Sequence, residues 1–164
     1  MSRKPELTVV ICANNRAQKL ARALDLYKMQ TLPYDRFEMV LVNDGSTDNT
    51  GDVMREALLT LPGTYVEHNR NRGLSAAKNS AIGAARGDYV VFVNDDTYPN
   101  LDYCERVLNF QLAHAGMKVV GLSCLPFTDE LQSRLFYFSM YHHNLYTPFI
   151  GMEEGKDYPF DHFI

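Results

Sequence analysis

The sequence predicts an α/β protein, a three-layer α/β/α sandwich built around a mostly parallel sheet. Short apolar runs alternate along the chain with segments in which apolar residues recur at helical spacing. This alternation is typical of parallel strands joined by right-handed crossover helices, which cover both faces of the sheet. The chain has 164 residues, of which 46% are hydrophobic and 22% charged, as in an ordinary globular domain with a core of its own.

The strands are predicted from their apolar runs. Residues 7–12 form a continuous, largely β-branched run, which is the signature of a strand buried on both faces. Four similar segments predict further strands, at residues 37–42, 64–67, 89–93 and 118–123.

The helices are predicted from apolar spacing and from their end signals. In residues 16–29, four apolar residues recur at helical spacing, namely Leu20, Ala23, Leu24 and Tyr27. Ser46 or Thr47 is expected to cap the second helix, whose inner face is formed by Val53, Ala57, Leu58 and Leu61. A third helix is expected over residues 74–86 with Gly87 as its C′ glycine, and a fourth over residues 101–115.

Composition excludes several classes of protein. The net charge is -4 and no basic stripe is present, which argues against nucleic acid as a partner. No apolar run approaches the roughly 18 residues that a transmembrane helix needs. The three cysteines, Cys12, Cys104 and Cys124, are scattered and are expected to be reduced core residues. We therefore expect a cytoplasmic protein, either free or peripheral to the inner face of the membrane.

Polar residues follow three of the predicted strands. In open α/β sheets, ligands bind beyond the carboxyl ends of the strands, where the loops converge. The segments that follow the first, second and fourth strands are residues 13–16, 43–46 and 94–97, and all three are polar. These segments are the expected location of the functional site.

Asp44 has two interpretations. It follows an apolar strand and precedes a glycine, so its carboxylate can accept hydrogen bonds from a nucleotide base or from ribose hydroxyls. The segment Asp44-Gly45-Ser46 is also typical of a turn, so Asp44 can equally be a turn residue or an N-cap.

Asp95 and Asp96 directly follow the fourth strand. Adjacent carboxylates repel each other, and a hard divalent cation with oxygen ligands removes that repulsion. The alternative is a solvated turn before Pro99. Lys78, on the alanine-rich third helix, either faces a phosphate or is solvated on an exposed face. A bound metal would give this acidic protein the positive charge that an anionic nucleotide diphosphate requires, and it would stabilise the leaving diphosphate.

Together these segments resemble the ordered motifs of family 2 glycosyltransferases of the A-type fold. The motifs are Val9–Arg16, Leu41–Asp48, Asn71–Asn79 with Gly83 and Ala85–Tyr89, and Val93–Asp96 followed by Pro99. The last corresponds to the family's DXD-type metal motif, except that Asn94 stands at the first position of the usual acidic triplet. The resemblance covers residues from about 5 to 125.

The resemblance implies a Rossmann-like A-type glycosyltransferase fold and a nucleotide-diphosphate-sugar donor, UDP-linked in many members. It also implies transfer of the sugar to an acceptor hydroxyl with inversion. It places Asp44 on the base, with Ala13 and Asn15 lining the same pocket, and Lys78 near the ribose or the diphosphate.

The same resemblance assigns the residues after the fourth strand. Asn94 and Asp95 would belong to the nucleotide site, with Asp95 on the ribose or the metal. Asp96 would be the main protein ligand to Mn²⁺ or Mg²⁺.

The resemblance also divides the chain. Residues 1–127 would form the nucleotide-sugar-binding domain, and residues 128–164 the aromatic-rich start of the acceptor-side region. Inverting members use a downstream carboxylate base, and the acids near the end of the chain (Glu153, Glu154, Asp157 and Asp161) lack its motif context. We therefore expect the base beyond Ile164, an acceptor-side region incomplete at the C-terminus, and self-association through the aromatic segment. His142 and His143 are expected to be packed or on the surface rather than bound to a metal.

Two other functions remain open from the sequence. A nucleotidyltransferase of related fold is one, although residues 13–16 do not supply its glycine-rich phosphate loop. A module that binds nucleotide without catalysis is the other. The acceptor, whether glycan, lipid-linked molecule or protein, is not specified by these motifs.

Overall fold

The computed structural model describes residues 4–115. The predicted strand at 118–123 and the aromatic region 128–164, with its acids and its histidine pair, lie outside the described residues, as does Cys124. Eight elements alternate along the described part: β1 (Leu7–Ala13), α1 (Ala17–Tyr27), β2 (Phe37–Asp44), α2 (Thr50–Ala57), β3 (Gly63–His68), α3 (Leu74–Ala84), β4 (Tyr89–Val93) and α4 (Tyr103–Ala113).

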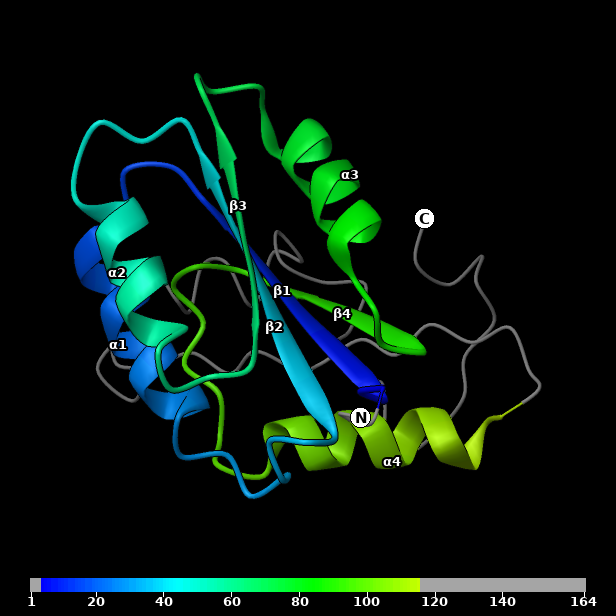
Figure 1. Cartoon of the computed structure of the whole chain (residues 1–164). Helices are drawn as coiled ribbons and strands as arrows, with labels where there is room; N and C mark the ends of the chain where they lie inside the picture. The colour runs from blue at the N-terminus through cyan, green and yellow to red at the C-terminus, as the bar shows by residue number, and fades with distance from the viewer. Residues whose placement is uncertain (1–3, 116–164) are drawn as a thin grey trace, which may run out of the picture. The chain divides into compact units, whose positions relative to one another are not determined.

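The strands form one parallel sheet in the order β3-β2-β1-β4. Leu7 of β1 is level with Phe37 of β2 and with Tyr89 of β4, and Asp44 of β2 is level with His68 of β3. All four carboxyl ends therefore lie at one edge of the sheet, as the sequence predicted (Figure 1).

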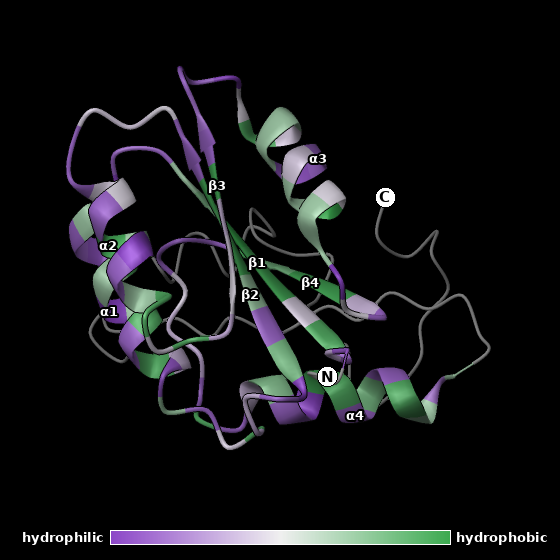
Figure 2. Ribbon diagram, in the orientation of Figure 1, coloured by the Kyte–Doolittle hydropathy of each residue, from purple (hydrophilic) through white to green (hydrophobic). Residues whose placement is uncertain are grey.

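Helices cover both faces of the sheet, which confirms the predicted α/β/α layers. One face of β1 and β2 packs against α1, α2 and α4, and its core includes Leu7, Val9, Ile11, Phe37, Met39, Leu41, Leu20, Leu24, Met54, Cys104 and Leu108. The other face packs against α3 through Val10, Val40, Val42, Ala77 and Ala81. Figure 2 shows the apolar residues concentrated in the strands and on the sides of the helices that face them.

The alternation of side chains along each strand explains this arrangement. Because successive residues of a strand point to opposite faces, a strand buried on both sides is largely apolar. The predicted inner face of α1 is confirmed, since its four predicted apolar residues are buried. On α2 the prediction omitted Met54, which is fully buried, while Val53 and Leu58 are only partly buried.

The predicted start of α2 is wrong. The helix begins at Thr50, and neither Ser46 nor Thr47 caps it. The hydroxyl of Ser46 instead accepts a hydrogen bond from the Asn15 backbone N–H at 3.0 Å. The Asp48 carboxylate accepts from the Thr50 N–H at 2.9 Å. Contacts to the loop after β1 hold the residues before α2 outside the helix. A capping rule that considers only neighbouring residues in the sequence cannot predict such contacts.

The predicted role of Gly87 is also wrong. The cap of α3 is Ala85, in an extended conformation, and Gly87 does not have a positive φ. A Cβ on Gly87 would lie 2.6 Å from both the backbone nitrogen and the hydroxyl oxygen of Thr8. The Gly87 N–H also donates to that hydroxyl at 2.9 Å. Gly87 is therefore required by close packing on β1, not by a left-handed turn.

Within residues 4–115, no helix has the length and apolar character that crossing a bilayer requires.

Candidate functional site

The loops beyond the carboxyl ends of the four strands form the candidate site. They are strongly polar and lie together at one edge of the sheet (Figure 2). The side chains there fall into two groups, which we call the Asp44 cluster and the Asp95–Asp96 pocket. The Asp44 cluster comprises Asn14, Asp44, His68, Arg72, Gly73 and Ser80.

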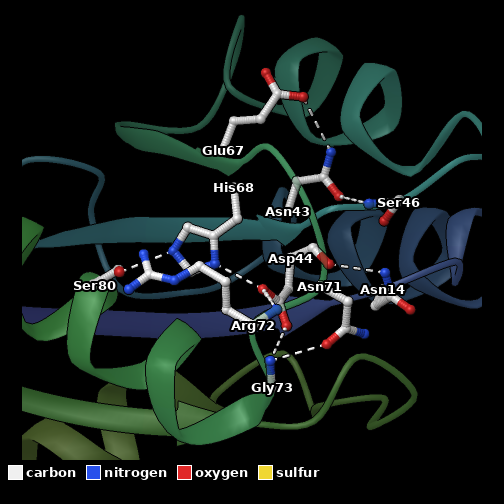
Figure 3. Close-up of polar contacts among 10 residues, drawn as sticks. All are labelled: Asn14, Asn43, Asp44, Ser46, Glu67, His68, Asn71, Arg72, Gly73 and Ser80. Carbon is white, nitrogen blue, oxygen red and sulfur yellow. Dashed lines mark hydrogen bonds and ion pairs between the residues drawn. The ribbon is translucent and has the colours of Figure 1, made fainter.

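The Asp44 carboxylate lies at the centre of its cluster and is almost fully buried. Its Oδ1 is 2.6 Å from His68 Nδ1 and accepts the Arg72 backbone N–H at 2.9 Å. Its Oδ2 accepts the Gly73 N–H at 2.9 Å. Figure 3 shows these bonds tying the end of β2 to the end of β3 and to the loop before α3. Asp44 is therefore not a cap of α2, because its side chain turns toward the opposite layer.

These hydrogen bonds determine the charge state of Asp44. Burial by itself raises the pKa of this carboxyl group, but the hydrogen bonds from His68, Arg72 and Gly73 outweigh burial and lower it below 3.8. Asp44 is ionised at neutral pH, and it offers a fixed negative charge at the edge of the sheet.

Two further contacts join the loops around Asp44. The Asn15 side-chain oxygen accepts the N–H of Thr47 at 2.8 Å and that of Asp48 at 3.3 Å, linking the loops after β1 and β2. Gly45 has a φ of 68°, and a Cβ there would lie 2.1 Å from the carbonyl carbon of Arg70. Only glycine allows the loops after β2 and β3 to approach so closely.

The Asp95–Asp96 pocket lies beside this cluster and has a volume of about 330 Å³. Residues of β1, α3 and β4 and the loops after β1 and β4 line it: Val10, Cys12, Arg16, Leu74, Lys78, Phe92, Val93, Asn94, Asp95 and Asp96. Lys78 Nζ lies 5.3 Å from the centre of the Phe92 ring. The structure thus places Lys78 at the pocket, as the phosphate-facing interpretation requires.

Two basic side chains approach the two carboxylates of the pocket. Arg16 Nε lies 3.6 Å from Asp95 Oδ2, and Lys19 Nζ lies 3.6 Å from Asp96 Oδ2. The Asp95 side chain is 15% exposed and that of Asp96 is 44% exposed. Burial raises the pKa of Asp95, and the neighbouring charge of Asp96 adds to the rise, while Arg16 and Lys19 oppose it.

The pair of aspartates fits a divalent cation. Within residues 4–115, no group of three or more His, Cys, Asp or Glu side chains converges on a metal-sized space. Mg²⁺ is usually bound through one or two carboxylates, with substrate phosphates and water completing its shell. Asp95 and Asp96 provide two hard oxygen donors beside an open pocket, where positive groups already balance their charge.

Cys12 on β1 is influenced by charged residues of both groups. Its thiol is half-buried, and burial raises its pKa to about 11, with Lys78 opposing the rise and Asp44 adding to it. The charges of the pocket and of the Asp44 cluster thus act on the same side chain. A ligand that spans both groups would pass over the end of β1.

The structure collects all the predicted site residues at this edge. Asp44 ends β2, Ala13 ends β1 and Asn15 lies in the loop that follows it, and the other four, Lys78, Asn94, Asp95 and Asp96, line the pocket.

Among the residues that sequence reasoning gave no role at the site are Arg16, Lys19 and His68. Arg16 is the N-cap residue of α1, and Lys19 lies in the first turn of that helix. His68 ends β3, and only the register of β3 against β2 shows that it faces Asp44.

Comparison with known proteins identifies the family. The family model described as glycosyl transferase family 2 matches residues 8–155. Glycosyltransferase GlyA of Streptococcus pneumoniae serotype 4 is 38% identical over 101 residues, 61% of this chain and 14% of GlyA. Validoxylamine A glucosyltransferase of Streptomyces hygroscopicus subsp. jinggangensis is 34% identical over 124 residues, 75% of this chain and 29% of that protein. This chain therefore spans less than a third of either relative.

Two solved structures are similar to the chain. S. aureus TarS 1–349 in complex with UDP-GlcNAc has a TM-score of 0.64 and 26% identity, over 74% of this chain and 37% of TarS. The mannosyltransferase PcManGT from Pyrobaculum calidifontis, in complex with GDP-Man and Mn²⁺, has a TM-score of 0.63 and 30% identity, over 77% of this chain and 37% of PcManGT. With the parallel sheet and the loops at its carboxyl edge, these matches show that the chain belongs to glycosyl transferase family 2 and has the A-type glycosyltransferase fold.

Proposed function

We propose that this chain binds a nucleotide-diphosphate sugar, UDP-linked, and serves the transfer of its sugar to an acceptor hydroxyl with inversion. The observation that carries the proposal is the pair Asp95 and Asp96 in a pocket that also contains Arg16 and Lys78. Carboxylates that can bind a metal and basic side chains that can bind phosphates line the same pocket. A similar solved structure holds UDP-GlcNAc, and another holds GDP-Man with Mn²⁺, which supports a donor of this class.

The Asp44 cluster is proposed to bind the base. A carboxylate offers about four acceptor positions, and the Asp44 carboxylate uses three of them within the protein. The remaining position is on Oδ2, and it suits an N–H of the base. Ala13 and Asn15, in the neighbouring loop, are proposed to line the same pocket.

The Asp95–Asp96 pocket is proposed to bind the ribose and the diphosphate. Lys78 and Arg16, which line the pocket, would offer positive charge to the phosphates, and Asn94 and Asp95 are proposed to bind the ribose hydroxyls. Asp96, the more exposed of the two aspartates, is proposed as the main protein ligand of Mn²⁺ or Mg²⁺. The metal, when bound, would stabilise the negative charge of the leaving diphosphate. Arg16 and Lys19 would then be released from the carboxylates.

We also propose that residues 1–127 form the donor-binding domain and that residues 128–164 belong to the acceptor side. Deprotonation of an acceptor hydroxyl needs a carboxylate within hydrogen-bond reach on the far side of the sugar. The described residues of the site account for donor binding alone. Binding and transfer are therefore separable in experiment.

The test is calorimetric titration of the chain with UDP, in Mn²⁺ and in chelator. Binding is expected in Mn²⁺, and Asp96→Ala and the chelator should each weaken it by at least about 10- to 100-fold, because removing a residue that only hydrogen-bonds to a metal ligand already causes a loss of that size. Asp95→Ala should be milder, because Asp96, the proposed main ligand of the metal, remains.

Asp52→Ala is the matched control, since Asp52 lies on α2, pairs with Arg55 and is not among the residues that line the pocket. UDP binding that is equally tight in chelator would contradict the metal site. Metal-dependent release of sugar from a UDP-sugar would distinguish an enzyme from a module that only binds nucleotide.

A further inference from the structure

His68 and Asp44 form a buried pair that the strand register creates. Asp44 ends β2 and His68 ends β3, and the two residues are direct partners across the parallel ladder. Their side chains therefore leave the sheet on the same face and meet, with Nδ1 2.6 Å from Oδ1. Both side chains are about 5% exposed. An ionised carboxylate only accepts hydrogen bonds, so Nδ1 carries the hydrogen and donates it.

Ser80 holds the other side of the imidazole ring. Its hydroxyl lies 2.9 Å from His68 Nε2 and comes from the middle of α3. A hydroxyl both donates and accepts, so it satisfies Nε2 whether His68 is neutral or protonated. With both ring nitrogens bound, the imidazole cannot rotate away from Asp44 without losing two hydrogen bonds (Figure 3).

The pair determines which oxygen of Asp44 is left for a ligand. Among the described residues, His68 and the Arg72 N–H occupy Oδ1, whereas Oδ2 accepts only the Gly73 N–H. Without His68, the carboxylate would keep two hydrogen bonds, both from the backbone of one loop, and each of its oxygens would have an open position. The His68 ring therefore selects Oδ2 as the oxygen with an open position.

We propose that His68 is a positioning residue for nucleotide-base recognition, orienting the Asp44 carboxylate through Nδ1 while Ser80 holds Nε2. The inference rests on the proposed function, because it assigns Asp44 to the base. His68 would not touch the nucleotide itself. Its effect reaches the base through Asp44 and should not extend to the diphosphate.

The test separates the base from the diphosphate by using two probes, UDP and inorganic pyrophosphate, each titrated in Mg²⁺. The matched pair of variants is His68→Asn and His68→Gln. The asparagine amide nitrogen is as many bonds from Cβ as Nδ1, so it can donate to Asp44, whereas the glutamine nitrogen corresponds to Nε2. His68→Ala removes both ring contacts, Ser80→Ala removes only the outer contact, and far-UV circular dichroism checks that each variant folds.

UDP binding should weaken by about 10-fold in His68→Ala and His68→Gln, as loss of a hydrogen bond to a charged group implies. His68→Asn should stay within about threefold of the parent, and Ser80→Ala should fall between these values. Pyrophosphate binding should stay within about twofold in all four variants, since neither ring nitrogen reaches the Asp95–Asp96 pocket.

Three results would overturn the inference: a folded His68→Ala that binds UDP like the parent, equal losses in His68→Asn and His68→Gln, or a pyrophosphate loss that matches the UDP loss. If His68→Ala does not fold, the asparagine and glutamine pair decides. Failure of the parent to bind UDP would instead contradict the proposed function, and it is visible before any variant is made.

Discussion

The two halves of the candidate site differ in how the protein holds its carboxylates. Asp44 is nearly buried and receives three hydrogen bonds of 2.9 Å or less from His68, Arg72 and Gly73. Asp95 and Asp96 are more exposed, and each faces a cation at 3.6 Å, beyond hydrogen-bond distance. One half is held by internal hydrogen bonds, and the other mainly by contacts between opposite charges.

This difference corresponds to the two kinds of ligand group that we propose. A base is planar and directional, so a rigid acceptor that is already oriented loses little entropy on binding it. A metal with a diphosphate brings its own charge and water, and it needs carboxylates that can leave their present partners. The same contrast predicts that substitution of Asp44 itself affects folding as well as ligand binding, and that substitutions in the pocket mainly affect ligand binding.

The largest expected effect is on stability, and it tests this contrast directly. Asp44→Ala leaves His68 and two backbone N–H groups without their acceptor, so it should lower the free energy of unfolding by about 3–5 kcal/mol. Asp96→Ala, at a half-exposed side chain, should change it by less than about 0.5 kcal/mol. Urea unfolding of both variants measures this, and similar losses would show that the two halves are equally rigid.

Substitution of either of two glycines should have an intermediate effect on the free energy of unfolding. Gly45 and Gly73 both have a positive φ, but a Cβ on Gly73 would meet nothing within 4 Å, whereas one on Gly45 would collide with the Arg70 backbone. Gly73→Ala should therefore cost only backbone strain, about 1–3 kcal/mol, because a φ of 86° with a ψ of 158° is a conformation that is essentially restricted to glycine. Gly45→Ala should cost about 1–3 kcal/mol more, since two loops must separate. Equal losses in thermal or urea unfolding would mean that the loops are not closely packed.

The smallest effect is a pH dependence of opposite sign in the two halves. The folded pKa of Asp44 lies below 3.8, so its stabilising contribution is present above 3.8 and is lost as pH falls through the folded value. The folded pKa of Asp95 lies above 3.8, so its contribution is present below 3.8 and is lost as pH rises through the folded value.

Urea unfolding between about pH 2.5 and 7 measures both contributions through the variants Asp44→Asn and Asp95→Asn. Relative to the parent at neutral pH, Asp95→Asn should gain a few tenths of a kcal/mol, and the gain should disappear in acid. The loss in Asp44→Asn should shrink in acid. Changes of the same sign in both variants would contradict the assigned environments.

The strands and the location of the site were predictable because they depend on local sequence. A strand buried on both faces is largely apolar along its length, and residues 7–12 show this without any knowledge of their partners. The polar segments after the strands follow from the same rule, since a parallel sheet brings its carboxyl ends to one edge.

The remaining features depend on contacts between distant segments. Strand β2 extends to Asp44, beyond the predicted end at residue 42, because it is paired with β3 up to His68. Pairing of this kind, and with it the meeting of Asp44 and His68, requires the register, which a single sequence does not contain. The late start of α2 has a similar cause, since Ser46 is bonded to the Asn15 backbone of another loop.

The strand order has a further consequence for where ligands enter. The chain runs outward from β1 to β2 and β3, then returns to place β4 on the other side of β1, so the crossover direction reverses there. The crossover that leaves β1 and the crossover that reaches β4 consequently use opposite layers, α1 on one face of the sheet and α3 on the other, and β1 and β4 are neighbours where the direction reverses. The pocket lies at this place, with Val10 and Cys12 on β1 and Phe92 and Val93 on β4. Because the strand order determines the position of the pocket, loop residues there can be exchanged to suit a different donor while the sheet beneath them stays unchanged.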